Sequence, residues 1–438
     1  MKFNSKLLLP ALAVFSGNCQ AFDWLFDPRF SATERYTDNL RMQINPTRDN
    51  LITTLSPGVL LGYMAENHAL NANLNWNELI YHGESELDLS EKIANMNHQF
   101  TGERFKTDIA AQYAVQSSIN TQLDLDGSGN LQVQVPRTTR SLAPSFTYNF
   151  TERNALQLSY NYVDVAFDRT EALANNLGYS DYDNQQLTAT FFHTYSQQLT
   201  FNFSGEYSVF NSSNNSNTSQ NLLLPDNSIT NRSTGSKFEQ QSTNFLYRGG
   251  LQYQYDEQTQ LALSAGMRQT ENHTSFLETV TFDPLPLGLN NVFNLVNPPA
   301  TKASGHVFSA NLNRKTEWGN FSVSAAQQLN PSSSGNQQQT TNFSGNLLYN
   351  LNERWSTALT ASYLISEDTR TFVNNIIDNN RTLSTLTPSL RWRWTPEINL
   401  DLSYTYRQQD FSFLNDSAIG NNLQLQFSYQ PQINRQVK

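Results

Sequence analysis

Two stretches near the C-terminus decide the fold: Asn399-Leu400-Asp401-Leu402-Ser403-Tyr404-Thr405-Tyr406-Arg407 and Leu423-Gln424-Leu425-Gln426-Phe427-Ser428-Tyr429. In both, large apolar or aromatic residues alternate with amides, hydroxyls and charges. Alternation of period two places one set of side chains on each face of a β-strand. The two stretches therefore predict an antiparallel hairpin within 395–429, with one face toward lipid and the other toward water.

The same alternation recurs along the whole chain and predicts about 18 strands, with 16 as the alternative. Before the last hairpin, the expected strands span approximately 29–40, 52–64, 70–77, 91–102, 105–116, 138–150, 156–167, 183–195, 199–210, 241–255, 261–270, 305–313, 321–329, 338–349, 355–366 and 383–394. Short connections alternate with long ones, and an even count places both termini beside the short ones. The predicted fold is all-β: a transmembrane antiparallel up-and-down β-barrel of the Gram-negative outer membrane. Its last strand should pair with its first, because pairing removes both edges.

Composition agrees with this interpretation. Hydrophobic residues make up 38% of the chain, the mean hydropathy is −0.55, and beyond the N-terminus no apolar run approaches the roughly 20 residues that a spanning helix needs. Aromatic residues reach 12% and charged residues only 15%. A membrane barrel distributes its apolar face by alternation, so low mean hydropathy with many aromatic residues is typical of it.

Residues 1–21 have the features of a secretory signal peptide: Lys2 and Lys6, an apolar run over 7–15, and a cleavage site at Cys19-Gln20-Ala21. The barrel is then expected over 22–430 and a periplasmic tail over 431–438. Lipidation of Cys19 is the alternative.

Removal of the signal leaves no cysteine, which excludes disulfides and thiolate metal ligands. It also changes the net charge from −10 to −12, because two lysines are lost. This acidic balance disfavours a nucleic-acid partner, and outer-membrane lipid is the partner that the alternation predicts.

Four charged residues fall on the polar face of the last strands: Arg391, Arg393, Asp401 and Arg407. A charge facing lipid at mid-depth costs about 2–4 kcal/mol, so these side chains are predicted to line the pore. They could brace the wall as a network or contact a solute.

One segment, Asp124-Leu125-Asp126-Gly127-Ser128-Gly129-Asn130-Leu131, matches the first eight positions of a calcium-binding loop. Its candidate ligands are Asp124, Asp126 and Ser128. Val135 stands where the bidentate carboxylate belongs, so a glycine-rich loop tip without metal is favoured over weak calcium binding. No other cofactor is predicted.

Two long segments are predicted to be loops: 211–240, rich in Asn and Ser, and 271–303, which is unusually apolar. Long loops are usually functional or disordered, and apolar surface left in water is costly. We therefore expect 271–303, with Phe276, Phe282, Leu285 and Phe293, to fold over or into the mouth and narrow the pore. Packing on neighbouring loops or on a partner is the alternative.

Three segments share a pattern centred on proline: Thr54-Leu55-Ser56-Pro57, Ser141-Leu142-Ala143-Pro144 and Thr385-Leu386-Thr387-Pro388. Proline lacks the N–H that a ladder needs, so each site should be a bulge or lie near a strand start.

Catalysis is not expected. The six histidines are scattered, and no serine nucleophile elbow accompanies them. The sequence therefore favours a non-enzymatic protein over an outer-membrane hydrolase.

The early strands carry Glu34-Arg35-Tyr36-Thr37-Asp38-Asn39-Leu40 and Thr53-Thr54-Leu55-Ser56-Pro57-Gly58-Val59. These motifs resemble the uncharacterised outer-membrane barrel family associated with PEP-CTERM and exopolysaccharide loci. The resemblance implies a barrel connected with extracellular polysaccharide production or surface export, with polysaccharide and periplasmic export components as partners. It implies no catalytic or ligand residue.

The leading hypothesis is a passive or gated porin-like conduit connected with surface polysaccharide. A barrel of this size is wide enough for an aqueous channel, and Asn, Gln, Ser and Thr on its inner face suit a hydrated neutral polymer. A closed structural or surface-interaction barrel is the second hypothesis.

Overall fold

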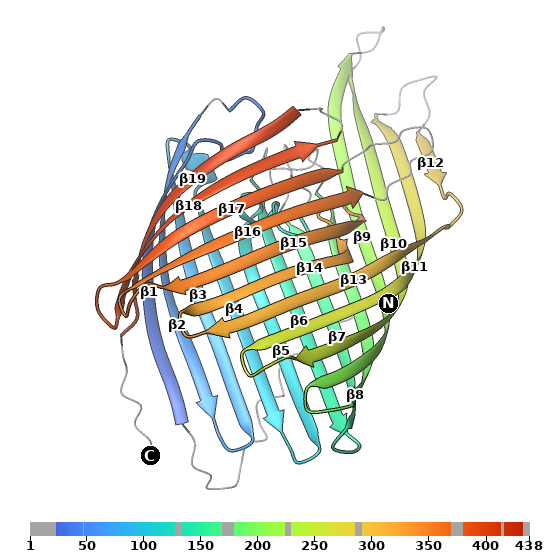
Figure 1. Cartoon of the computed structure of the whole chain (residues 1–438). Coiled ribbons are helices and arrows are strands. Elements are labelled where there is room, and N and C mark those ends of the chain that lie inside the picture. The colour runs from blue at the N-terminus through green and yellow to red at the C-terminus, as the bar shows by residue number, and fades with distance from the viewer. Residues whose placement is uncertain are drawn as a thin grey trace.

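The computed structural model describes residues 23–46, 48–127, 129, 134–168, 179–223, 229–284, 291–368, 380–412 and 416–431. Nineteen strands in these ranges form one antiparallel sheet, and the first strand pairs with both the second and the last (Figure 1). Eighteen of them make a closed wall, since β12 pairs with β11 alone while β11 also pairs with β13. The prediction of a closed barrel of about 18 strands is confirmed.

The wall strands are β1 (Asp23–Thr37), β2 (Asn50–Met64), β3 (His68–His82), β4 (Leu89–Thr101), β5 (Phe105–Ser117), β6 (Pro136–Asn149), β7 (Asn154–Phe167), β8 (Asp181–Thr194), β9 (Leu199–Leu223), β10 (Ile229–Gln254), β11 (Thr259–Asp283), β13 (Thr301–Thr316), β14 (Gly319–Pro331), β15 (Gln337–Asn350), β16 (Trp355–Asp368), β17 (Arg381–Arg393), β18 (Ile398–Phe411) and β19 (Asp416–Tyr429). The short strand β12 (Val292–Val296) and the helical turns η1 (Ser85–Leu87) and α1 (Ser118–Thr121) lie in connections. Within the described ranges, no helix has the length and apolarity to cross a membrane.

The barrel closes where the alternating hairpin predicts. β19 pairs with β1 from Phe30↔Tyr429 to Thr37↔Asn422, and with β18 on its other side. β19 ends at Tyr429, as expected from the sequence. Residues 1–21, the expected signal peptide, and 432–438 of the expected tail lie outside the described residues.

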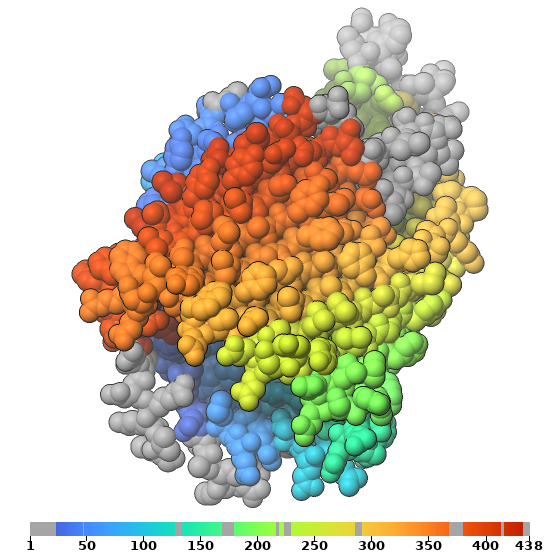
Figure 2. All heavy atoms as spheres, in the orientation of Figure 1, coloured from blue at the N-terminus to red at the C-terminus, as the bar shows by residue number. Residues whose placement is uncertain are grey.

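The outer face is apolar and its aromatic residues gather at the rim of the short turns. Leu402, Tyr404, Leu423 and Leu425 are exposed on this outer face. Ring pairs line the short-turn rim: Trp24–Tyr63, Tyr148–Phe150, Tyr195–Phe201, Tyr253–Tyr255, Trp318–Tyr349 and Trp355–Trp392. Such an aromatic girdle marks a membrane interface, and short turns mark the periplasmic rim, so the long connections are extracellular. Figure 2 shows the side chains of β14–β19 packed into one outer surface.

The three proline motifs interrupt the ladder without shifting it. Pro57, Pro144 and Pro388 are paired with the preceding strand. Toward the following strand, two residue pairs are missing at each site, and pairing then resumes in the same register. The expected bulges are therefore absent from these three sites in the described wall. Proline leaves a local gap because it has no N–H to donate.

The expectation of two long loops is wrong. β9, β10 and β11 have 25, 26 and 25 residues, so most of 211–240 and the stretch 271–283 are strand. Phe276 and Phe282 lie on β11 and Phe293 lies on β12, whereas Leu285 lies outside the described residues. In Figure 1 the hairpin of β9 and β10 rises past the rest of the extracellular rim. Narrowing of the mouth by Phe276, Phe282, Leu285 and Phe293 stays a prediction.

We predict that Leu402→Arg destabilises the barrel by about 2–4 kcal/mol, because its side chain would face lipid near mid-depth. Equilibrium unfolding in urea from lipid vesicles measures this cost. The matched variant Ser403→Arg, on the neighbouring inward position, should cost much less. Equal costs for the two variants would contradict the assigned faces.

Candidate functional site: a segment that crosses the lumen

The connection between β5 and β6 enters the barrel. Ser118, Ile119, Thr121, Gln122 and Val135 are all buried, although they belong to a connection that starts at the extracellular rim. Connections normally run over a protein's surface, so burial of this kind requires the segment to fold inward. We call residues 118–135 the crossing segment; of these, 128 and 130–133 lie outside the described residues.

The base of the crossing segment is fixed to the strands that it joins. Ser118 N donates to Val135 O at 3.0 Å, and Val135 N donates to Ser118 Oγ at 2.8 Å. Glu91 on β4 accepts from Ser117 N at 3.0 Å and from Asn120 Nδ2 at 2.9 Å. These bonds hold the entry and the exit of the segment side by side.

Apolar packing strengthens the same base. Ile119 belongs to a buried cluster with Met42, Ile52, Leu79, Tyr81, Leu87 and Ala418. Val135 belongs to a second cluster with Val165, Phe167, Tyr179, Tyr182 and Phe210. Burial of a large apolar side chain stabilises by about 1.5–3 kcal/mol, so the base is the firmly held part of the segment.

The tip of the crossing segment reaches the opposite wall. Arg381 Nη2 on β17 donates to Gly127 O at 2.7 Å and to Asp124 O at 3.1 Å. Gln338 Nε2 on β15 donates to Leu125 O at 2.8 Å. β15 is nine strands from β5 in either direction around the wall, so the segment spans the full lumen.

Two glycines of the calcium-like motif allow this close approach. A Cβ on Gly127 would lie 2.2 Å from Gln122 O. Gly129 has φ +75°, and a Cβ there would lie 2.8 Å from Arg381 Cδ. Gln409 Nε2 on β18 donates to Gly129 O at 3.2 Å. Glycine is needed here for a left-handed backbone and for contact with the wall.

A second connection meets the crossing segment inside the barrel. Ser333, between β14 and β15, is fully buried, and its backbone N donates to Asp126 O at 3.0 Å. Its Oγ donates to Gln122 Oε1 at 2.7 Å. Ser180 N, at the start of β8, donates to Ser333 O at 2.8 Å. The two connections and the wall thus form one hydrogen-bonded layer.

The predicted calcium ligands lie within this layer. The Asp126 carboxylate forms an ion pair with Arg137 and accepts from Tyr182 Oη at 2.8 Å. Ser128 lies outside the described residues. In the part of the chain that the structure describes, no three His, Cys, Asp or Glu side chains gather as a metal site would require. Calcium binding stays a prediction, and it would require Asp126 to exchange its present partners.

Asp124 sits in a less favourable environment for its charge. The pKa of its carboxyl is raised from 3.8 to about 6, first by burial and second by the neighbouring Asp126, against the opposing charges of Arg137, Arg381 and Arg407. The docked segment therefore binds a proton in a pH range where a solvated aspartate is ionised.

The crossing segment separates two chambers. One has a volume of about 380 Å³ and is lined by Asp124 together with Arg35, Glu91 and Arg407. The other has a volume of about 340 Å³ and is lined by Asp126 and by strands β7–β11 and β13–β15. Each volume lies near the lower limit of small-molecule sites.

The four predicted pore-lining residues lie an even number of positions from Arg381 on β17 or from Gln409 on β18. They are therefore on the same, inward face of the wall. Arg407 lines the 380 Å³ chamber. Arg391 Nε donates to Asp401 Oδ1 at 2.5 Å, so this pair braces neighbouring strands β17 and β18. Arg393 follows the same inward parity on β17. Contact of the four with a solute stays a prediction.

Sequence reasoning missed Arg381, Gln338 and Gln409, which hold the tip. All three are buried polar residues on inward positions close to the extracellular ends of their strands. Nothing in their local sequence distinguishes them from other polar lumen residues. Only closure of the barrel brings them to residues 124–129.

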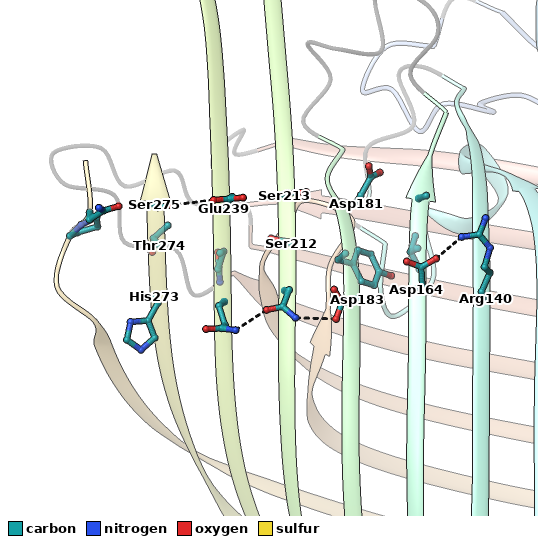
Figure 3. A pocket seen from close by; sticks show the side chains of 18 residues that line it. Arg140, Asp164, Asp181, Asp183, Ser212, Ser213, Glu239, His273, Thr274 and Ser275 are labelled. Carbon is teal, nitrogen blue, oxygen red and sulfur yellow. Dashed lines mark hydrogen bonds and ion pairs between the residues drawn. The ribbon is translucent and has the colours of Figure 1, made fainter. Parts of the chain in front are cut away.

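A third hollow, of about 820 Å³, lies on the outside of the wall (Figure 3). Polar contacts cross its strands: Arg140–Asp164 at 3.0 Å, Asn211–Asp183 at 3.0 Å and Gln241–Asn211 at 3.0 Å. These residues are on the same face of the sheet as Leu187 of β8 and Phe245 of β10, which are exposed, so they face outward. The hollow is therefore part of a polar band above the apolar belt, and it does not belong to the lumen.

Neither a family model nor a curated protein matches the chain. Similar solved structures include the ferric-catecholate import receptor Fiu of E. coli K12, with 11% identity, a TM-score of 0.42, and 92% of this chain and 82% of that chain covered. The outer membrane channel DcaP of Acinetobacter baumannii has 10% identity, a TM-score of 0.40, and coverage of 94% and 98%. OmpT of Vibrio cholerae, without its loop L8, has 8% identity, a TM-score of 0.35, and coverage of 94% and 100%.

At these identities the similarities carry no information on substrate. The closed ladder, the apolar outer face and the aromatic rim are the features that a bacterial outer-membrane barrel requires. The chain is an outer-membrane β-barrel.

Lowering the pH should hold the crossing segment in place. The docked Asp124 has the raised pKa, so docking gains stability as pH falls from about 6 toward 4 and loses it as pH rises through that range. From pH 7 to pH 5 the population of the undocked state should fall about tenfold. Hydrogen exchange of residues 118–127 measures this. Asp124→Asn should abolish the dependence, whereas Asp256→Asn, in a periplasmic turn, should preserve it.

Proposed function

We propose that this chain is a gated porin-like conduit of the outer membrane, in which the crossing segment is the gate. The observation that supports this is that different kinds of interaction hold the base and the tip of the segment. Its base is held by apolar clusters, whereas its described tip contacts are polar: hydrogen bonds from Arg381, Gln338, Gln409 and Ser333 N to backbone carbonyls, and the contacts of the Asp126 carboxylate with Arg137 and Tyr182. A hydrogen bond contributes about 0.5–1.5 kcal/mol net, somewhat more with a charged donor. The tip can therefore detach while the base stays folded.

The chamber walls suggest the class of solute. Amide and hydroxyl side chains predominate on the inner face of strands β7–β10 and β14: Asn161, Asn184, Gln186, Ser208, Asn244, Gln328 and Asn330 line the 340 Å³ chamber. Such groups exchange hydrogen bonds with water or sugar at little net cost. We therefore propose hydrated, neutral solutes, sugars among them.

The link to exopolysaccharide export rests on the sequence resemblance. A polymer chain would pass only after the tip withdraws, because the docked segment separates the chambers. Polysaccharide transport and contact with periplasmic export components therefore belong, in this proposal, to the undocked state.

A closed structural barrel is the second candidate. The depth at which Arg381 and Gln409 are buried, at 2% and 1% exposure, favours it, since deeply buried polar contacts exchange slowly with water. A hydrolase has less support: among the described hydrogen bonds, His68 contacts His98, His82 contacts Thr53 and His193 contacts Asn154. We propose no enzymatic activity.

Conductance in planar bilayers tests the gate. Arg381→Met removes two hydrogen bonds to the tip and keeps the length of the side chain, so the mean single-channel conductance should rise severalfold. Gly129→Ala should act in the same direction, because its Cβ would collide with Arg381. Arg391→Met, on the same strand but remote from the tip, is the matched control.

Two results would contradict the proposal. A wild-type barrel that stays electrically silent, together with a silent Arg381→Met variant of native fold, would favour the closed structural barrel. A conductance that rises equally in Arg391→Met would show that the tip contacts do not control passage.

A further inference from the structure

The wall is split between β13 and β14. Their ladder runs from Thr316↔Gly319 only as far as Phe308↔Gln327. Beyond that pair, residues 301–307 of β13 pair with β11 alone, and residues 328–331 of β14 pair with β15 alone. We call these two facing edges the seam. In Figure 1, β13 runs on toward β11 and β12 beyond the end of β14.

The seam differs from the proline interruptions. Those omit two pairs and then resume in register, whereas the β13–β14 ladder does not resume in the described residues. Proline is no cause here, because Pro331 is the last residue of β14. Outward-facing Met267, which pairs with His306 in the seam, is half exposed. The split therefore starts beside the apolar belt, where unpaired backbone groups are costly.

The 340 Å³ chamber extends to this split. Val307 and Phe308 of β13 and residues 326–331 of β14 line it. Two inward-facing apolar side chains, Leu246 and Val307, are buried at the same place, at 8% and 6% exposure. A chamber with polar walls thus has an apolar corner, and that corner lies at the seam.

Arg268 on β11 supplies a charge at this corner. Its side chain is 7% exposed, and it lies over Gly305, where a Cβ would come within 2.6 Å of Nη2. Nη1 donates to Thr270 Oγ1 at 3.2 Å, and Nη2 donates to Gln339 Oε1 at 3.3 Å. Gln339 belongs to β15, so the guanidinium reaches across the split.

No carboxylate neutralises Arg268 among the described residues. The carboxylates that line the chamber are engaged elsewhere: Glu206 lies 3.8 Å from Arg248, and Asp126 pairs with Arg137. Arg268 Nε is buried and has no hydrogen-bond partner in the described part of the chain. A buried cation without a counter-charge is unfavourable, so an anion is the missing partner.

We propose that the seam is a lateral portal and that Arg268 binds the head group of a single-chain anionic amphiphile, such as a fatty acid. The carboxylate pairs with the guanidinium, and the chain lies against Leu246, Val307 and Phe308 and passes between β13 and β14 into the lipid. This route is separate from passage past the crossing segment.

Binding of dodecanoate to the full barrel in lipid nanodiscs tests the site by calorimetry. Arg268→Gln should weaken binding at least tenfold, and Arg268→Lys, which retains the charge, should weaken it less. Arg140→Gln, whose guanidinium pairs with Asp164 on the outer face, should bind as wild type does. Dodecanol, which lacks the charge, should bind at least tenfold more weakly than dodecanoate. Absence of dodecanoate binding to the wild type, or equal binding by Arg268→Gln, would overturn the site.

A reversible disulfide tests the portal. Val307 and Gln328 would face each other if the ladder continued in the register of Phe308↔Gln327. Oxidised Val307→Cys/Gln328→Cys should transfer bound dodecanoate to vesicles at least tenfold more slowly, and reduction should restore the rate. Asn311→Cys/Ser324→Cys, a pair already in the ladder, is the control. Transfer at the wild-type rate through the locked seam would overturn lateral exit.

Discussion

The requirement that every backbone N–H and C=O facing lipid be hydrogen-bonded governs this protein. It is met by pairing each strand with two neighbours and by joining β19 to β1, because an open edge would leave a row of unbonded groups in hydrocarbon. Once the ladder is closed, the outward side chains must be apolar. The inward side chains then supply nearly all the polar contacts. The hairpin of 395–429 meets both requirements, because its apolar and polar residues alternate.

Closure also decides where irregular backbone can lie. The crossing segment is tolerated within the barrel because the inner wall supplies donors and acceptors, such as Gln338 and Arg381. Apolar burial near Ile119 and Val135 holds its base, whereas hydrogen bonds at 124–129 hold its tip. A segment anchored in this uneven way has one end that can move at lower cost than the other. The wall itself need not change when the tip moves.

Alternation is visible in the sequence wherever one face meets lipid, which is why the barrel, its closing pair and the end at Tyr429 were predictable. The extensions of β9–β11 were not, since residues such as Asn211 and Ser213 lie above the membrane and have no apolar face to alternate with. The motif at Asp124 was recognised, but its glycines serve contact with Arg381 and Gln122. Residues 381, 338 and 409 are far from 124 in sequence, and only ring closure makes them neighbours.

At the seam, the requirement for backbone hydrogen bonds is met least completely. The side chains there also differ from those on the rest of the inner wall. Two other buried inward cations, Arg381 and Arg137, have partners on the crossing segment. Arg268 lies instead over a glycine, beside buried Leu246 and Val307, at the point where two strands part. A buried charge, an apolar corner in a polar chamber and an interrupted ladder are each unfavourable by themselves. Together they are complementary to one amphiphilic chain, whose head can neutralise the charge while its tail fills the opening toward lipid.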